Sequence, residues 1–214
     1  MVFSASSAPL RWVRKVPWPL EHPLAHRIHE LLHADALVIL DGPAHPSNRP
    51  TLVFGNRGIA QATLTVYGPK VGLHSGHYGN YAPNPAIRLA QLLASMKDED
   101  GRVLVAGYYD GIHLDDADRK LLAETPDDEV ALRKRIGIAA PDKVGATYQE
   151  ALQYPSLNVR GMASASVGAK ASNIVPSEAI AELDFRTTPE ADGHRLQDLV
   201  QAHIEKQGYH VTQG

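Results

Sequence analysis

A glycine-rich segment with two histidines is the first feature of this sequence that could do chemistry. Residues 72–80 read Gly-Leu-His-Ser-Gly-His-Tyr-Gly-Asn, so His74 and His77 lie among three glycines. Glycine lets a backbone approach a ligand or a neighbouring chain closely. An imidazole placed there can polarise a carbonyl group. The alternative is a surface loop with two exposed histidines, and residue types alone leave both interpretations open.

Three further polar residues stand where a ligand could reach them. Arg186 is on the polar face of a predicted strand, where its guanidinium could bind a substrate carboxylate or pair with Glu182 or Asp184. Asn173 precedes that strand and could donate hydrogen bonds or cap a turn. Asp41 follows an apolar run, at the end of a strand where ligands gather in open α/β sheets. A carboxylate there suits a divalent metal, and it equally suits a turn.

Four histidines, spaced by four, three and four residues, share one face of a predicted helix between residues 23 and 33. They are His22, His26, His29 and His33. Such spacing can hold a metal. That face lies opposite the leucine and isoleucine stripe of the same helix, and the sequence offers no evident partners that would orient the imidazoles. A solvated histidine stripe is therefore the favoured interpretation.

The elements that must position these residues fall into two groups. Residues 36–40 form a continuous apolar run that predicts a buried parallel strand. Beyond residue 59 the pattern predicts strand, helix, strand, strand, helix and strand. The predicted elements are a strand at 59–67, a helix opening at Asn84-Pro85, strands at 156–162 and 175–187, a helix at 191–207 and a strand from 209.

This order predicts an α+β, ferredoxin-like βαββαβ domain, with a four-stranded antiparallel sheet and both helices on one face. Residues 102–155 read as an insertion with two short charged helices, at about 115–124 and 127–135. Residues 1–22 show no clear periodicity, and two prolines interrupt them. We therefore divide the chain into residues 1–55, of which 1–22 are expected to be irregular, and the domain 56–214.

Composition narrows the class of protein. The chain has 214 residues, a formal net charge of −3 and no cysteine. The scattered lysines and arginines provide no basic surface for nucleic acid. No apolar run approaches the ~18 residues of a membrane span. Without cysteine there is no disulfide or thiolate metal site, which fits a cytoplasmic protein acting on a small substrate.

Several of these segments together resemble a metallopeptidase family that includes carnosine dipeptidase, acetylornithine deacetylase, succinyl-diaminopimelate desuccinylase and aminoacylase. The resemblance runs from about residue 34 to 208 and fits the dipeptidase branch best. It rests on the runs Ala36 to Gly42, Phe54 to Gly58, Tyr67 to Pro69, Leu73 to Gly79, Pro83 to Pro85, Leu92 to Gly101, Tyr154 to Leu157, and Ile174 to Ser177 through Leu183 to Arg186.

The resemblance implies a role for each matching residue. Asp41 would be a ligand to one of two zinc ions, and His74 would reach from the dimerisation (lid) domain into the partner subunit's site to stabilise the tetrahedral intermediate. Arg186 would bind the substrate's terminal carboxylate, with Asn173 nearby. The chain would then be the lid domain of a metal-dependent dipeptidase-like hydrolase that cleaves small peptides or N-acyl amino acids, and residues 1–55 a fragment of its α/β catalytic domain.

The sequence also departs from the family pattern. The expected His-x-Asp pair and Glu-Glu pair do not occur upstream of Asp41, and no histidine ligand follows the lid. One carboxylate cannot replace the three protein ligands of a catalytic zinc site. We therefore expect a reading frame truncated at both ends and a chain inactive by itself that forms a homodimer. The alternative function is a non-catalytic ferredoxin-like binding or dimerisation module.

Overall fold

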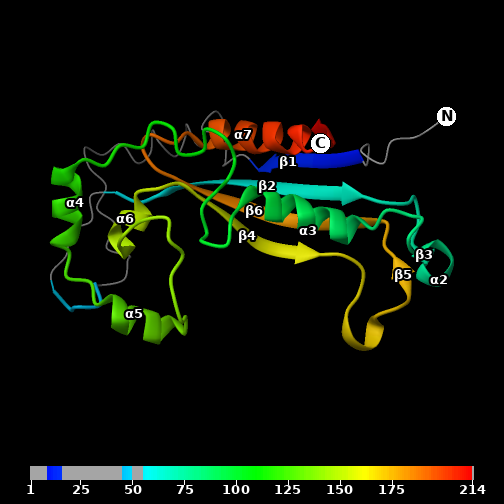
Figure 1. Cartoon of the computed structure of the whole chain (residues 1–214), viewed down its shortest axis with the longest axis horizontal. Helices are drawn as coiled ribbons and strands as arrows, with labels where there is room; N and C mark the ends of the chain where they lie inside the picture. Colours follow the sequence, from blue (N-terminus) through cyan, green and yellow to red (C-terminus); the bar gives the residue numbers. More distant parts are fainter. Residues whose placement is uncertain (1–8, 16–44, 50–54, 214) are drawn as a thin grey trace, which may run out of the picture.

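The computed structural model describes residues 9–15, 45–49 and 55–213. Asp41, the predicted strand at 36–40 and the histidine stripe lie outside these residues. A five-stranded sheet dominates the described part, in the order β4-β6-β2-β1-β7 (Figure 1). Its strands are β1 (Pro9–Lys15), β2 (Gly58–Tyr67), β4 (Ser156–Ala163), β6 (Glu178–Thr187) and β7 (His210–Gln213).

The centre of the sheet is the antiparallel pair β2 and β6, which stays in register over ten residues, from Gly58 opposite Thr187 to Tyr67 opposite Glu178. Every second side chain of both strands is buried in the core, because successive residues of a strand point to opposite faces. The fully buried members are Ala62, Leu64, Val66, Ala179, Ala181, Leu183 and Phe185. The alternation predicted from the sequence at 59–67 is therefore confirmed.

Two helices, α3 (Pro85–Met96) and α7 (Gly193–Lys206), contact β2 and β6. Leu89 and Leu92 of α3 and Leu196 and Val200 of α7 belong to the same buried cluster as the apolar side chains of the two strands. The helices therefore cover one face of the sheet, as predicted. The Asn84 side chain caps α3 by accepting a hydrogen bond from the Ala86 amide at 2.9 Å.

The predicted four-stranded sheet is correct only in part. Residues 9–15 form β1, where an irregular segment was expected, and β1 lies between β2 and β7. It is antiparallel to β2 and parallel to β7. This pairing is non-local and leaves little local signal, and Pro9 is tolerated because it is the first residue of the strand.

Residues 102–155 are only partly an insertion. Val103, Val105 and Tyr108 are buried in the main core, so the start of the segment belongs to the domain itself. The remainder contains the two predicted helices, α4 (Asp116–Ala123) and α5 (Glu129–Ile136), and a third one, α6 (Tyr148–Leu152), which the sequence did not predict. The buried Glu150 of α6 pairs with Arg119 of α4 and accepts a hydrogen bond from the Ala146 amide at 3.0 Å.

Within the described residues, no helix combines the length and apolar character needed to cross a membrane.

Because β2 carries the core, truncation of Leu64 should destabilise the fold strongly. We expect Leu64→Ala to lower the free energy of unfolding by about 2–5 kcal/mol, since the side chain is fully buried and leaves a cavity. Leu121→Ala, on α4 with a side chain that is 66% exposed, should change it by less than about 0.5 kcal/mol. Urea denaturation followed by circular dichroism measures both values, and equal losses would contradict this packing.

Candidate functional site

Two very short strands hold the first predicted site residue. β3 (Leu73–His74) pairs antiparallel with β5 (Ile174–Val175), and the Ser75 amide donates to the Asn173 carbonyl at 3.0 Å. His74 and Asn173 therefore lie on neighbouring segments, next to the short helix α2 (Ser75–Tyr78). Figure 1 shows β3, β5 and α2 together beyond one end of the main sheet.

The hydrogen bonding of His74 determines which ring nitrogen carries the proton. Nδ1 accepts a hydrogen bond from the Gly76 amide at 3.0 Å. A ring nitrogen that accepts is unprotonated, so the neutral imidazole carries its proton on Nε2. The side chain is exposed, and Nε2–H is thus a hydrogen-bond donor presented outward.

The glycines of this segment permit close contacts within the chain. A Cβ at Gly76 would come within 2.9 Å of the His74 ring, and a Cβ at Gly72 within 2.4 Å of Ile174 Cδ1. Neither position can carry a larger residue without displacing a neighbour. The second histidine, His77, places its ring centroid 5.0 Å from that of His74. The loop therefore positions an imidazole, which the residue types alone did not establish.

Arg186 lies near the opposite end of β6. Its side chain is 47% exposed, and its Nε lies 4.0 Å from Asp184 Oδ1. Asp184 itself is buried and accepts a hydrogen bond from Asn158 Nδ2 at 2.9 Å. Glu182, the other predicted partner, contacts Thr63 and Arg160 instead. The ion pair considered from the sequence is thus present with Asp184 and is long, which leaves much of the guanidinium exposed.

One chain does not bring the predicted residues into a single site. β6 extends from residue 178 to 187, and Arg186 is eight residues beyond its start. At ~3.3 Å per residue, roughly 26 Å of strand separates Arg186 from the end where the chain enters from β5. His74 and Asn173 therefore lie together at one end of the sheet, and Arg186 lies at the other.

The described residues contain no group of three or more His, Asp or Glu side chains that could hold a metal ion. They therefore do not fit a zinc centre. Asp41, the predicted ligand, lies outside them.

Sequence reasoning assigned no role to Arg57, Tyr108 or Thr188, which gather at the Arg186 end. Each has a buried polar atom without a hydrogen-bond partner: Arg57 Nε, Tyr108 Oη and Thr188 Oγ1. Burial, and then the nearby charge of Arg186, lower the pKa of Arg57. Burial raises the pKa of Tyr108, so its hydroxyl stays neutral. Arg57 lies within one of the segments that carry the family resemblance, which was the only sequence signal.

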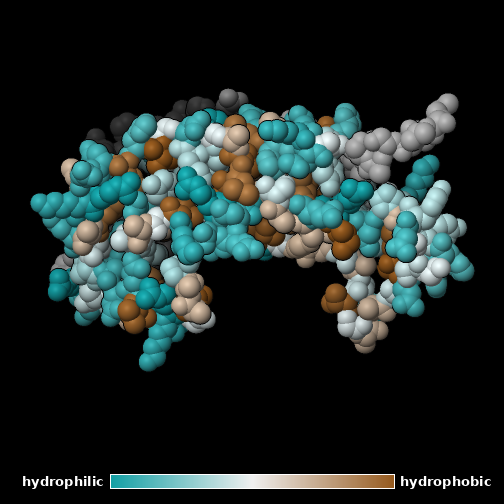
Figure 2. All heavy atoms as spheres, viewed as in Figure 1, coloured by the Kyte–Doolittle hydropathy of each residue, from teal (hydrophilic) through white to brown (hydrophobic). Residues whose placement is uncertain are grey.

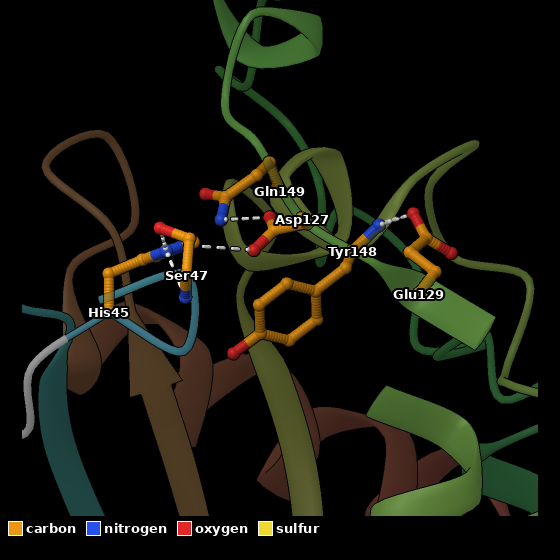
Figure 3. Close-up of polar contacts among 6 residues, drawn as sticks. All are labelled: His45, Ser47, Asp127, Glu129, Tyr148 and Gln149. Atoms are coloured by element: carbon orange, nitrogen blue, oxygen red, sulfur yellow. Dashed lines mark hydrogen bonds and ion pairs between the residues drawn. The ribbon is translucent and has the colours of Figure 1, made fainter. Parts of the chain in front are cut away.

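A third polar cluster ties residues 45–49 to residues 127–149 (Figure 3). His45 Nδ1 accepts from the Ser47 amide at 3.2 Å, so its Nε2 donates to Asp127 Oδ1 at 3.0 Å. Gln149 Nε2 donates to Asp127 Oδ2 at 2.6 Å. The Ser47 hydroxyl contacts the same Nδ1 at 2.7 Å. Because the amide and hydroxyl of Ser47 share one acceptor two residues away, this is a local turn and a structural tie, not an activated nucleophile.

Comparison with known proteins places this geometry in a family. Residues 54–212 match the family model of the peptidase dimerisation domain of M20 peptidases. The Cys-Gly metallodipeptidase of Saccharomyces cerevisiae is 29% identical over 184 residues, which are 80% of this chain and 36% of the relative. The corresponding protein of Schizosaccharomyces pombe is 27% identical, over 81% of this chain and 37% of the relative.

Comparison with solved structures leads to the same family. An M20 family metallo-carboxypeptidase from Sulfolobus solfataricus superimposes with a TM-score of 0.66 and 30% identity, over 77% of this chain and 44% of that one. The dipeptidase Dug1p from Saccharomyces cerevisiae gives a TM-score of 0.61 and 26% identity, over 71% of this chain and 32% of that one. Human carnosine dipeptidase 1 shares the fold, with a TM-score of 0.63 at 24% identity, over 71% of this chain and 33% of that one.

The chain therefore belongs to the M20 peptidase dimerisation-domain family, and the predicted membership is confirmed. It is similar to the Dug1-type metallodipeptidases. It spans just over a third of the length of the curated yeast relatives that it matches.

The contact between Gly76 and His74 predicts that Gly76→Ala changes the histidine without unfolding the domain. The added Cβ would displace the ring and break the bond to Nδ1, so the imidazole should become a mixture of tautomers. Side-chain ¹⁵N chemical shifts of His74 report this directly. Gly161→Ala, where a Cβ would meet only Glu182 at 3.8 Å, is the matched control. An unchanged His74 tautomer in Gly76→Ala would contradict the structure.

Proposed function

We propose that this chain supplies the dimerisation (lid) part of a metal-dependent dipeptidase-like hydrolase that cleaves amide bonds of small peptides or N-acyl amino acids. The observation that carries the proposal is the exposed imidazole of His74, whose Nδ1 accepts from the Gly76 amide and leaves Nε2 as the donor, in a domain of the M20 family. The names of the yeast relatives, Cys-Gly metallodipeptidases, support the reaction class.

In this proposal His74 acts on the scissile carbonyl. Negative charge develops on the carbonyl oxygen as the tetrahedral intermediate forms, and a fixed donor aimed at that oxygen stabilises the charge. His74 can donate from Nε2 because the Gly76 amide occupies Nδ1. Asn173, on the adjacent segment, would add a side-chain donor beside the same oxygen.

Arg186 would bind the terminal carboxylate of the substrate. A guanidinium binds a carboxylate through two parallel N–H···O bonds, which fixes orientation as well as position. The 4.0 Å separation from Asp184 leaves donors of Arg186 available for that contact.

The separation of these groups requires two copies of the chain. His74 and Asn173 of one subunit would complete a site that contains Arg186 of the other, so that a two-fold dimer holds two such sites. Dimerisation is then part of the chemistry as well as of the architecture.

The free edge of β4 is the surface we propose for this dimer. In the described part of the chain β4 pairs only with β6, so its other edge can pair antiparallel with a two-fold copy of itself. Three exposed apolar side chains lie on β4 and on α3, which covers the neighbouring strand: Ile87, Val159 and Met162. Figure 2 shows the molecule hollowed on this side, between projections that Figure 1 identifies as α5 and the loop 164–172.

We further propose the domain plan that accompanies this function. Residues 56–214 would form a ferredoxin-like lid to which β1 adds a strand, and the rest of residues 1–55 would belong to an α/β catalytic domain. Two zinc ions would be bound outside the described residues, with Asp41 among their ligands. The absence of a metal-ligand cluster from the described residues favours one rival, a non-catalytic dimerisation module.

A chimera tests both the reaction and the sharing of sites. In the yeast Cys-Gly metallodipeptidase, the matching segment is replaced by residues 54–212 of this chain. Cys-Gly hydrolysis should persist, and His74→Ala or Arg186→Ala should each lower kcat/KM ~10²- to 10³-fold. After subunit exchange, the two variants mixed equally should recover about a quarter of the activity, because half of the dimers then hold one intact site.

The matched control mixes His74→Ala with the double variant His74→Ala/Arg186→Ala, which leaves no intact site and should recover nothing. No recovery in the first mixture would place both residues in one subunit's site. A chimera that dimerises but does not hydrolyse the dipeptide would favour the non-catalytic module.

The dimer surface has its own test in the isolated chain. The paired substitution Ile87→Asp/Met162→Asp puts like charges across the proposed two-fold contact and should give a monomer by size exclusion with light scattering at micromolar concentration. Leu121→Asp, at a more exposed position on α4, should remain dimeric. A dimer that survives the paired substitution would contradict this surface.

A further inference from the structure

The end of the sheet that carries Arg186 holds a second arginine on the same face. Ile59 pairs with Arg186, and Gly58 with Thr187. Continuing the alternation by one residue places Arg57 opposite Thr188 and diagonal to Arg186, a relation in which Cα atoms lie roughly 7–8 Å apart. Arg186 is also the charged group that lowers the pKa of Arg57 most strongly, which agrees with this proximity.

Arg57 is held in place but not neutralised. Its Nη2 donates to the Tyr154 carbonyl at 2.8 Å, and its Nε is buried without a partner. Among the described residues, none of the ion pairs includes Arg57. A half-buried cation without an ion-pair partner is unfavourable, and a buried donor without an acceptor costs more. The surroundings of Arg57 therefore suit an incoming anion.

Two hydroxyls at the same end add donors. Tyr108 is 1% exposed and its Oη has no partner, and the buried Oγ1 of Thr188 has none either. Tyr108 is connected to Arg57 through two T-shaped ring contacts. The ring centroids of Tyr108 and Tyr109 lie 5.5 Å apart, and those of Tyr109 and Tyr154 lie 5.8 Å apart. Tyr154 is the residue whose carbonyl holds Arg57.

The charges at this end leave room for one anion. Arg57 and Arg186 provide two positive charges, and Asp184, 4.0 Å from Arg186, provides one negative charge. A carboxylate would balance the remaining positive charge and could accept hydrogen bonds from both guanidinium groups. Since Arg186 is 47% exposed, a ligand from solvent can reach the pair.

We propose that Arg57 is a second carboxylate-binding residue: with Arg186 it binds the terminal carboxylate of a peptide substrate, and the hydroxyls of Tyr108 and Thr188 donate to the same group. This inference rests on the proposed function, and it names a residue that the role of Arg186 does not require.

The test is a titration of the 214-residue chain, followed by the arginine ¹⁵Nε–¹H resonances. Glycylglycine should shift the Arg57 and Arg186 resonances together and saturably, and glycylglycinamide, which lacks the carboxylate, should shift neither. Arg57→Gln should raise the dissociation constant for glycylglycine at least tenfold. Arg133→Gln, which removes a charge from α5, should leave it unchanged. Tyr108→Phe, which leaves both arginines in place, should raise it less than Arg57→Gln does.

Other outcomes overturn the inference. If Arg186→Gln weakens glycylglycine binding and Arg57→Gln does not, Arg57 has no role in recognition, and the proposed function stands. If the Arg57 resonance does not move at all, a carboxylate of the chain itself already occupies it. If inorganic phosphate binds as tightly as glycylglycine, the pair is a general anion site. The recovery of activity in mixed chimeras is independent of all three, so failure of the proposed function is seen separately.

Discussion

Both ends of this domain depend on the ten-residue antiparallel ladder between β2 and β6. Its register is fixed by burial: a slip of one residue would move Leu64 and Phe185, both fully buried, onto the open face of the sheet. With the register fixed, the chain must leave the ladder at set points. At one end the Gly68 amide donates to the Ser177 carbonyl at 2.7 Å, next to the small sheet that carries His74. At the other end Arg57 and Thr188 leave the ladder side by side.

The same ladder keeps the two groups of polar residues apart. An antiparallel pair packed against two helices cannot fold back on itself, so His74 cannot approach Arg186 of its own chain by a loop movement. In the proposed function each group is half of a site, and a second subunit supplies the missing half. This geometric constraint, more than the free edge of β4, is the reason to regard dimerisation as part of the chemistry.

The sequence predicted the elements whose signals are local. The alternation at 59–67, the cap at Asn84 and the apolar stripes of α3 and α7 each lie within a few residues, and each was confirmed. It did not predict β1, β3 or β5, because a strand of two residues has no period and β1 pairs only with segments distant in sequence. Among the predicted site residues, His74 and Arg186 could be found from their residue types and from the family resemblance. The tautomer of His74 could be assigned only from the structure.

Arg57 illustrates a different limit, because its significance lies in a partner that it lacks. A neutral side chain at this position could donate to the Tyr154 carbonyl without placing a half-buried charge beside Arg186. The arrangement at His74 follows the same principle. There the chain satisfies one ring nitrogen internally and leaves the other as a donor. At both ends of the ladder, the structure holds donors in place while leaving one hydrogen bond of each group unmade. Donors that are already ordered lose little conformational entropy when a ligand binds.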